Sequence, residues 1–195
     1  TVDVVVTNAK GDEARVSGGF TFSPLGVITV RPLGALPSDW VSVVGNGFVP
    51  GARLTVGGVQ AEIRVVQTQQ LDIVVPLCPP GVVDVVVTNP DGRSATLGGL
   101  FTCQTVVLSP STLSVSPNGP MTISWSSPRP SDDYFQDEIR LYRVADGSPT
   151  GWFERLTGSS GTIPLNAPTT PGDYEFGSLL GGFSQVSKSA PVSVR

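Results

Sequence analysis

The sequence predicts an all-β protein built from stacked β-sandwiches, and three observations support this fold class. First, 23 glycines and 18 prolines divide the 195 residues into short segments, many of them rich in valine. Turn residues alternating with short β-branched runs are typical of sandwiches. Second, no stretch keeps the hydrophobic period of a helix. Third, the chain repeats part of itself at a fixed spacing, which indicates tandem domains.

The repeat relates residues 1–22 to residues 82–103. The two segments align without a gap at an offset of 81 residues and are identical at 12 of 22 positions. Each reads as two strands joined by a tight turn, and a two-stranded hairpin alone is only marginally stable in water. Residues 1–22 are therefore expected to be the C-terminal hairpin of an upstream repeat, whose preceding part was removed or left out. Alternatively, Val2, Val4 and Val6 add as a strand to a sheet edge in this chain or a neighbour.

Residues 23–104 are expected to form one complete sandwich that the hairpin 82–103 closes. Its other strands are expected at residues 27–30, 40–45, 53–57, 60–66 and 71–75. Gly47 and Gly57-Gly58 permit the positive φ angles that tight turns need. The valine runs are expected to fill two facing sheets, with Phe48 and Phe101 in the core.

The motifs of this segment resemble those of the IPT/TIG domain. In order, they are Gly47-Phe48 with Gly51, then VGGVQA at 56–61, LDIVVP at 71–76, VDVVVTN at 83–89 and finally Phe101-Thr102. The resemblance implies an immunoglobulin-like sandwich over residues 23–104. Through the repeat it also covers residues 1–22, as the tail of a second copy. Cys103 departs from the family, which tends to have an aromatic residue there.

Residues 105–195 are expected to form a second sandwich with its own pattern. Strands are expected at residues 106–108, 112–115, 121–125, 138–144, 152–156, 162–165, 173–179 and 191–194. Trp125 resembles the buried tryptophan of fibronectin- or immunoglobulin-like sandwiches, and Tyr174 resembles their corner tyrosine. Residues 139–144 and 171–176 also resemble small sandwich modules of bacterial secreted hydrolases. The predicted architecture is thus a tandem of immunoglobulin-like β-sandwiches with short, proline-stiffened junctions.

Cys78 and Cys103 are the only cysteines. They either remain buried free thiols or form a disulfide. A ladder centred on Pro90-Asp91 would place the two cysteines opposite each other, although Pro79-Pro80-Gly81 could break that register. A disulfide would indicate an oxidising compartment.

Composition argues against several function classes. The net charge is −4 and the 12 lysines and arginines are scattered, so a clustered basic face for nucleic acid is not expected. No apolar run approaches the roughly 20 residues of a membrane helix. Histidine, the commonest general base and metal ligand, is absent. No cofactor and no membrane insertion are therefore expected.

The acidic cluster and the serines do not indicate an active site. Asp132, Asp133, Asp137 and Glu138 could contribute to a calcium site, but a solvated acidic loop is the favoured interpretation. Nothing indicates the cleft that a glycosidase carboxylate pair needs. Residues 158–161, Gly-Ser-Ser-Gly, are expected to be a hairpin loop, because a serine nucleophile needs a base and a strand–turn–helix context. The chain is therefore not expected to be an enzyme, and no catalytic or metal residue is assigned.

Trp40, Tyr134 and Trp152 are the candidate ligand-contact aromatics. Such side chains stack on sugar rings or anchor protein interfaces; alternatively, they cap the ends of the sandwiches. If residues 152–156 form a strand, one of Trp152 and Phe153 points outward.

The expected function is that of a non-catalytic structural or adhesion module in an extracellular, cell-surface, virion or filament protein of a bacterium or phage. It would act as a semi-rigid spacer and bind protein partners, or itself, through sheet edges. The alternative is a carbohydrate-binding accessory region of a secreted hydrolase.

Overall fold

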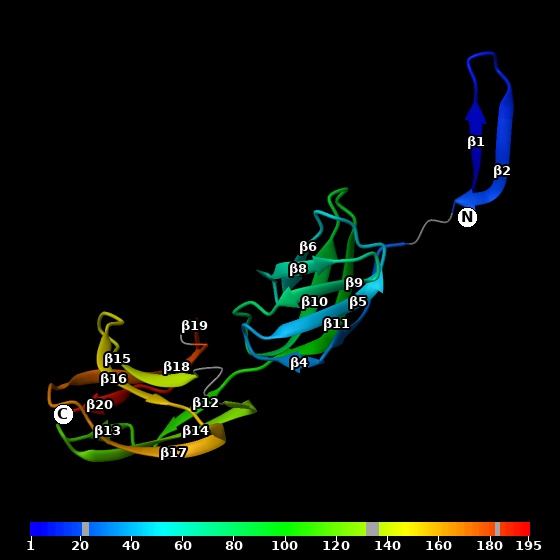
Figure 1. Ribbon diagram of the computed structural model, residues 1–195. Coiled ribbons are helices and arrows are strands. Elements are labelled where there is room, and N and C mark those ends of the chain that lie inside the picture. The colour runs from blue at the N-terminus through cyan, green and yellow to red at the C-terminus, as the bar shows by residue number, and fades with distance from the viewer. Residues whose placement is uncertain (21–23, 132–136, 182–183) are drawn as a thin grey trace.

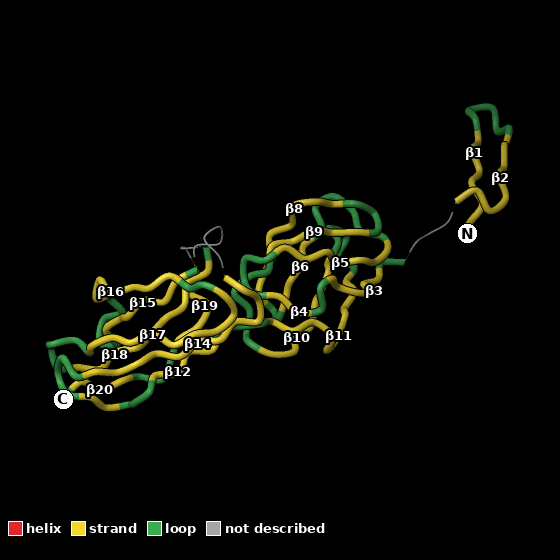
Figure 2. Tube along the Cα trace, turned by 60° about the horizontal axis from the view of Figure 1, so that its bottom comes forward, coloured by secondary structure: helices red, strands yellow, loops and turns green. Residues whose placement is uncertain are grey.

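The computed structural model describes residues 1–20, 24–131, 137–181 and 184–195. The described residues form strands and connecting loops and no helix, which confirms the all-β fold class (Figures 1 and 2). Accordingly, no described segment is a helix that could cross a membrane. The strands form a hairpin and two layered sandwiches, each sandwich with its own hydrophobic core.

The hairpin consists of β1 (Val2–Thr7) and β2 (Glu13–Phe20), which pair antiparallel. Every residue of both strands is exposed. The valines that would face a core in a complete sandwich are therefore open to solvent.

The first sandwich has a five-stranded sheet in the order β4-β11-β10-β6-β7 facing a four-stranded sheet in the order β3-β5-β9-β8. Alternate side chains of both sheets meet in one core, as the valine pattern predicts. The bounds are β3 (Gly26–Arg31), β4 (Gly34–Ala35), β5 (Trp40–Asn46), β6 (Arg53–Val56), β7 (Val59–Gln60), β8 (Glu62–Val66), β9 (Gln70–Val74), β10 (Gly81–Thr88) and β11 (Ser94–Cys103).

Two details of the first sandwich differ from expectation. The single strand expected at residues 60–66 is two strands in different sheets, because β7 pairs with β6 whereas β8 pairs with β9. Buried Ala61 lies at the crossing and donates its N–H to the carbonyl of Leu54. In addition, the short strand β4, which pairs parallel with the end of β11, lies between residues 30 and 40, where no strand was expected.

The second sandwich has a three-stranded sheet in the order β12-β14-β17 facing a sheet in the order β13-β20-β18-β15-β16, with β19 also paired to β18. The bounds are β12 (Val107–Pro110), β13 (Ser114–Val115), β14 (Pro120–Ser131), β15 (Glu138–Arg143), β16 (Pro149–Arg155), β17 (Gly158–Asn166), β18 (Gly172–Leu180), β19 (Ser184–Lys188) and β20 (Val192–Val194).

The two aromatic signatures of the second sandwich are confirmed. Trp125 is buried in the core. Tyr174 is buried too, and its hydroxyl donates to the carbonyl of Thr170 at 2.9 Å, the backward bond of a tyrosine corner. The expected loop at residues 158–161 is wrong: these residues begin β17, and Gly161 pairs with Trp125. A Cβ on Gly161 would lie 2.8 Å from the indole Nε1, so the glycine makes room for the tryptophan ring.

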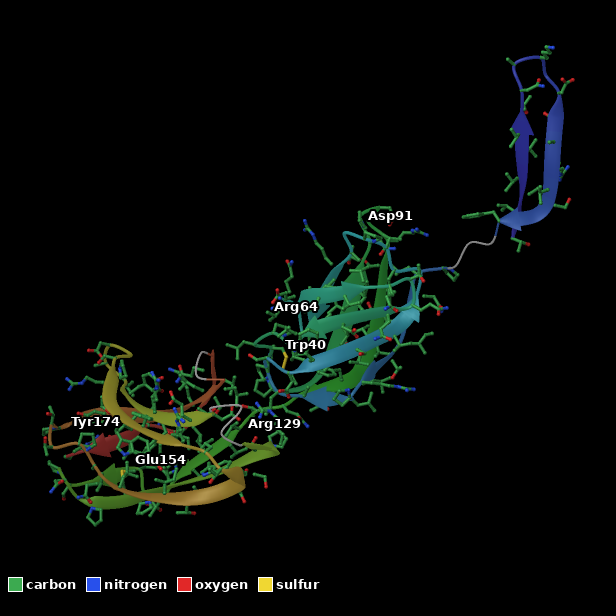
Figure 3. The ribbon with its side chains drawn as sticks, viewed as in Figure 1. Trp40, Arg64, Asp91, Arg129, Glu154 and Tyr174 are labelled. Atoms are coloured by element: carbon green, nitrogen blue, oxygen red, sulfur yellow. A yellow bond between two sulfur atoms is a disulfide. The ribbon has the colours of Figure 1, made fainter. Side chains whose placement is uncertain are left out.

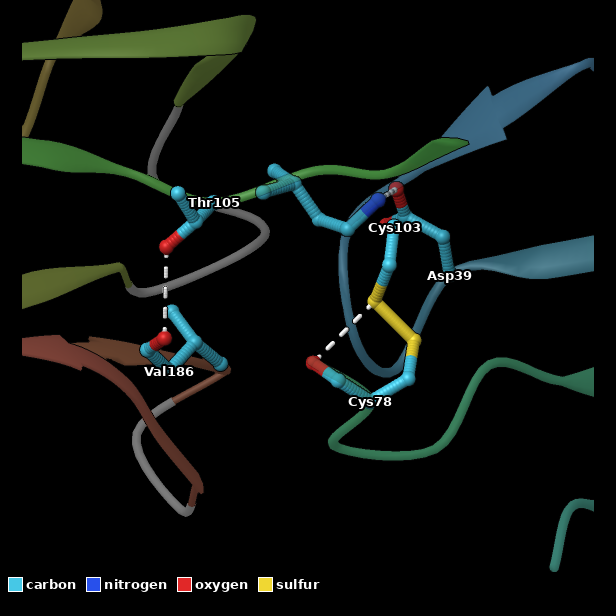
Figure 4. The surroundings of a disulfide bond; sticks show 6 residues. Asp39, Cys78, Cys103, Thr105 and Val186 are labelled. Atoms are coloured by element: carbon cyan, nitrogen blue, oxygen red, sulfur yellow. Dashed lines mark hydrogen bonds between the residues drawn. A yellow bond between two sulfur atoms is a disulfide. The ribbon is translucent and has the colours of Figure 1, made fainter. Parts of the chain in front are cut away.

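Cys78 and Cys103 form a disulfide with a Cα–Cα distance of 6.2 Å (Figure 4). The register that suggested this pairing is wrong, because Cys103 pairs with Gly81 in the ladder and Cys78 lies in the loop before β10. The register shifts between Val83 and Val85. The bond therefore ties the loop before β10 to the end of β11.

We expect the double variant Cys78→Ala/Cys103→Ala to lower the free energy of unfolding of the first sandwich by about 3 kcal/mol. The two residues are separated by 25 positions, and closing a loop of that size in the unfolded chain accounts for an effect of about this magnitude. Urea denaturation of the variant beside reduced and oxidised wild type measures it. A variant as stable as the oxidised protein would contradict the expectation.

Candidate functional site

The loop after β4 carries a leucine out of the first sandwich and into the core of the second. Leu36 has no exposed surface and belongs to the hydrophobic cluster that contains Val106, Ile139 and Leu156 of the second sandwich. The cluster of the first sandwich includes the neighbouring Ala35 but not Leu36. The side chain of Leu36 thus contributes to a core formed by the other half of the chain.

Residues 36–39, the Leu36 loop, are held in shape by the first sandwich. The N–H of Leu36 donates to Oδ2 of Asp39 at 2.9 Å, and the N–H of Asp39 donates back to the carbonyl of Leu36 at 3.1 Å. Two backbone hydrogen bonds join Ser38 and Asp39 to Val75, the residue directly after β9. The loop therefore presents Leu36 from a fixed base.

An ion-pair network of one buried and two partly buried side chains lies beside the Leu36 loop. Arg129, near the end of β14 in the second sandwich, places Nε 3.2 Å from Oδ1 of Asp39 and Nη1 3.1 Å from Oδ2 of Asp137. The Asp137 side chain is 0% exposed, and its Oδ1 also accepts the N–H of Gly181 at 3.0 Å. Figure 3 shows Arg129 where the two sandwiches meet. One guanidinium thus connects a carboxylate of each sandwich.

The covalent connection between the sandwiches is ordered by hydrogen bonds on both sides. Gln104 donates its N–H to the carbonyl of Ala35 at 2.9 Å in the first sandwich. The hydroxyl of Thr105 donates to the carbonyl of Val186 at 3.3 Å in the second, close to the disulfide in Figure 4. We call this connection, together with the Leu36 loop and Arg129, the inter-sandwich interface. The connection, the Leu36 loop and Arg129 each limit the positions that the other two can adopt.

Burial at this interface changes the pKa of Asp39. Loss of solvent raises the pKa of Asp39 above its usual value, against the opposing effects of the Leu36 N–H and Arg129. The nearby carboxylate of Asp137 adds to the upward shift. A carboxyl group with a raised pKa in the folded state stabilises the fold at acidic pH, and that contribution is lost as the pH rises through the folded pKa.

We therefore expect Asp39→Asn to gain stability relative to wild type as the pH rises from the acidic range to neutrality. Urea denaturation at a series of pH values measures the difference. The matched control is Asp91→Asn, because Arg93 lowers the pKa of Asp91, so this variant should lose stability relative to wild type over the same rise. Parallel pH profiles for Asp39→Asn and wild type would contradict the assignment.

A second feature is a groove on the second sandwich with a volume of about 420 Å³. Its lining includes Trp152, Tyr174, Thr150, Asn166 and Arg143. The half-buried ring of Trp152 packs edge-on against Phe176 with centroids 5.7 Å apart, while the Arg143 guanidinium lies 6.0 Å from the centroid of the Tyr174 ring. The groove thus combines aromatic and hydrogen-bonding groups.

The two predicted ligand-contact aromatics that the structure describes, Trp40 and Trp152, lie on different sandwiches. Trp40 is 61% exposed at the start of β5 in the first sandwich, whereas Trp152 lines the groove of the second. Tyr134 lies outside the described residues. Phe153, not Trp152, is the outward-facing member of its pair, with 54% exposure.

The interpretation of the acidic cluster as a solvated loop is wrong for the two carboxylates that the structure describes. Asp137 is paired with Arg129, and buried Glu138 is paired with Arg140. Asp132 and Asp133 lie outside the described residues. Within the described ranges, no group of three or more acidic or cysteine side chains is arranged to hold a metal ion.

Comparison with known protein families shows which domain family the first sandwich matches. Residues 37–103 match the IPT/TIG domain. The match begins at Pro37, inside the Leu36 loop, and ends at the disulfide-bonded Cys103. The IPT/TIG domain therefore accounts for the immunoglobulin-like fold of the first sandwich, as its motifs predict. No curated protein matches the chain.

Several solved structures are similar to the chain at low identity. The γ-CGTase of Alkalophilic bacillus clarkii is 16% identical with a TM-score of 0.40, over 97% of this chain and 29% of the enzyme. A Bacteroides ovatus mixed-linkage glucan utilization protein, SGBP-B, in complex with a heptasaccharide is 12% identical with a TM-score of 0.38, over 84% of this chain and 50% of that protein. The Plexin A4 extracellular region is 10% identical with a TM-score of 0.40, over 91% of this chain and 19% of that protein. The chain spans at most half the length of these three proteins.

Proposed function

We propose that the chain is a non-catalytic structural module of an extracellular, cell-surface or virion protein, which holds its neighbours at a fixed spacing and offers sheet edges to protein partners. The inter-sandwich interface is the observation that carries this proposal. Domains joined by a bare linker reorient freely, whereas a buried side chain and a partly buried ion pair across the junction oppose rotation. Here both are present, through Leu36 and Arg129.

The disulfide supports the proposed location. Such bonds form and persist in oxidising environments outside the cytosol. In this chain the bond lies next to the junction between the sandwiches, because Cys103 is two residues from Thr105. The bond holds the end of β11, the strand that directly precedes the second sandwich. A covalent tie at that point suits a module that bears load between its neighbours.

The buried charged groups also suit a structural role. A catalytic carboxyl must be reachable by substrate, but Asp137 and Glu138 are buried against arginines. Their contacts fix the end of β14, β15 and the turn after β18 in place, which is a positional function.

Electron paramagnetic resonance measurements of the distance between two spin labels test the spacer role. Spin labels at Arg64→Cys of β8 and Glu154→Cys of β16 report on one sandwich each, and both sites are exposed and labelled in Figure 3. The proposal predicts one narrow distance distribution, which broadens when Leu36→Asp is added. A broad distribution in the parent protein would refute the spacer role.

The groove around Trp152 favours a second candidate function, carbohydrate binding. An aromatic ring beside hydroxyl and amide groups is the chemistry that recognises a sugar. Binding to a glycan array should be lost with Trp152→Ala and weakened with Asn166→Ala, which removes a polar group without disturbing the core. Trp40→Ala removes an exposed tryptophan outside the groove and is the matched control. An array without signal, or equal loss with Trp40→Ala, would exclude this candidate.

A further inference from the structure

We propose that the hairpin β1–β2 is the closing part of another IPT/TIG-like sandwich, whose core face is formed by Val4, Val6 and Val16. The partner that covers this face is a segment that has the equivalents of strands β3 to β9 but lacks a closing hairpin of its own. This inference is independent of the inter-sandwich interface and of the spacer role.

The hairpin has the backbone design of β10–β11 in detail, at the offset of 81 residues. Val2 pairs with Phe20 and Val4 with Val16, as Val83 pairs with Phe101 and Val85 with Leu97, and the register shifts between the same two pairs.

The irregularity that bends both hairpins is also the same. Gly18 has φ +64° and donates its N–H to the Asp3 carboxylate at 2.7 Å; Gly99 has φ +61° and donates to the Asp84 carboxylate at 2.9 Å. Residues 1–20 thus reproduce a hairpin that has been shaped for the inside of a sandwich.

Burial is where the two hairpins differ. Val85, Val87 and Leu97 are between 0% and 7% exposed in the closed first sandwich. Their counterparts Val4, Val6 and Val16 are 41%, 64% and 61% exposed. A strand pair that only added to a sheet edge would gain its affinity from backbone hydrogen bonds and would use side-chain pockets for specificity, whereas this continuous apolar row corresponds residue by residue to a buried one. The row matches a core face whose partner sheet is supplied from elsewhere.

A polar group points to the same partner. Asn89, buried in the turn directly after β10, donates its side-chain N–H to the carbonyl of Gly47 in the loop after β5 at 2.8 Å. The equivalent Asn8 instead donates to the neighbouring Asp12 side chain at 3.0 Å. The partner is therefore expected to bring a loop carbonyl equivalent to that of Gly47.

A second copy of the chain does not satisfy these requirements. Its own first sandwich is already closed by β10–β11, which occupies the position that β1–β2 would need. Only a sandwich that lacks its closing hairpin has room for β1–β2. The partner that fits Val4, Val6 and Val16 is therefore a segment with the equivalents of β3 to β9 alone.

A fusion chain tests the inference. A copy of residues 24–81, which contains β3 to β9, is placed directly before Thr1 of the full chain, with Cys78→Ser in the copy only. Thr1 aligns with Val82, so the copy precedes the hairpin at its natural spacing. We expect a new cooperative unfolding transition, and hydrogen exchange at the amides of Val4 to Val6 slowed by roughly a hundredfold or more.

Matched variants and two further measurements make the test decisive. In the fusion chain, Val6→Asp should abolish both signals, whereas Val5→Asp on the opposite face should retain them. A fusion with residues 24–104, already closed by its own hairpin, should leave β1 unprotected. Fast exchange at Val4 to Val6 in the first fusion would overturn the inference. Slow exchange of these amides in the unmodified chain at low concentration would also overturn it. So would slow exchange that develops only when the unmodified chain self-associates and that Val6→Asp abolishes.

Discussion

Replacing Leu36 with aspartate is expected to separate the two sandwiches while leaving the first one folded. The leucine contributes to the core of the second sandwich and not to that of the first. Burying a leucine side chain is worth about 1.5–3 kcal/mol, and a buried carboxylate without a partner costs several kcal/mol more. Undocking avoids that cost, so the interface should open.

Calorimetry measures this separation. The wild type should unfold with coupled transitions, and Leu36→Asp should shift the transition of the second sandwich to a lower temperature while the first keeps its disulfide-tied stability. Leu33→Asp is the control, because Leu33 lies three residues earlier and is 55% exposed. Indistinguishable thermograms for the two variants would show that Leu36 does not hold the interface.

Arg129→Met is expected to lower the free energy of unfolding of the second sandwich by about 3–5 kcal/mol, because it leaves the buried Asp137 carboxylate without its cation. Methionine keeps much of the apolar stem, so the loss reports mainly on charge. The N–H of Gly181 remains as a hydrogen-bond donor to Asp137 and moderates the effect.

Two comparisons isolate the charge effect of Arg129. Arg93→Met removes an ion pair between two exposed side chains, at 60% and 49% exposure, and should cost far less than Arg129→Met because solvent screens such a pair. Arg129→Met/Asp137→Asn should recover part of the loss, because the fully buried carboxylate of Asp137 is then removed together with its cation. Denaturant unfolding gives all three values; equal costs for Arg129→Met and Arg93→Met would contradict the buried network.

The architecture follows from local sequence signals, whereas the interface does not. Alternating valines and glycine-rich turns predict the strands, and the sequence around Tyr174 predicts the corner that the structure contains. Leu36 and Asp39 acquire their roles from partners far along the chain, around Val106 and at Arg129. Nothing in their immediate sequence distinguishes them from residues of an ordinary loop, since contacts over such separations leave no periodic pattern.

The incorrect expectations have similar causes. A run such as residues 60–66 reads as one strand although its backbone crosses from one sheet to the other at Ala61. The Gly-Ser-Ser-Gly run looks like a turn, but Gly161 is small because the Trp125 ring lies against it. In both places a neighbour that is distant in sequence decides the conformation, so propensity alone cannot assign it.

Residual dipolar couplings of the unmodified chain in a dilute aligning medium test the central claim most directly, because they compare the orientations of two bodies without any substitution. Amides of residues 24–104 and of residues 105–195 should fit a single alignment tensor when the structure is used as one rigid unit. Two tensors of different magnitude would mean that the sandwiches reorient independently, and that Leu36 and Arg129 do not fix the spacing.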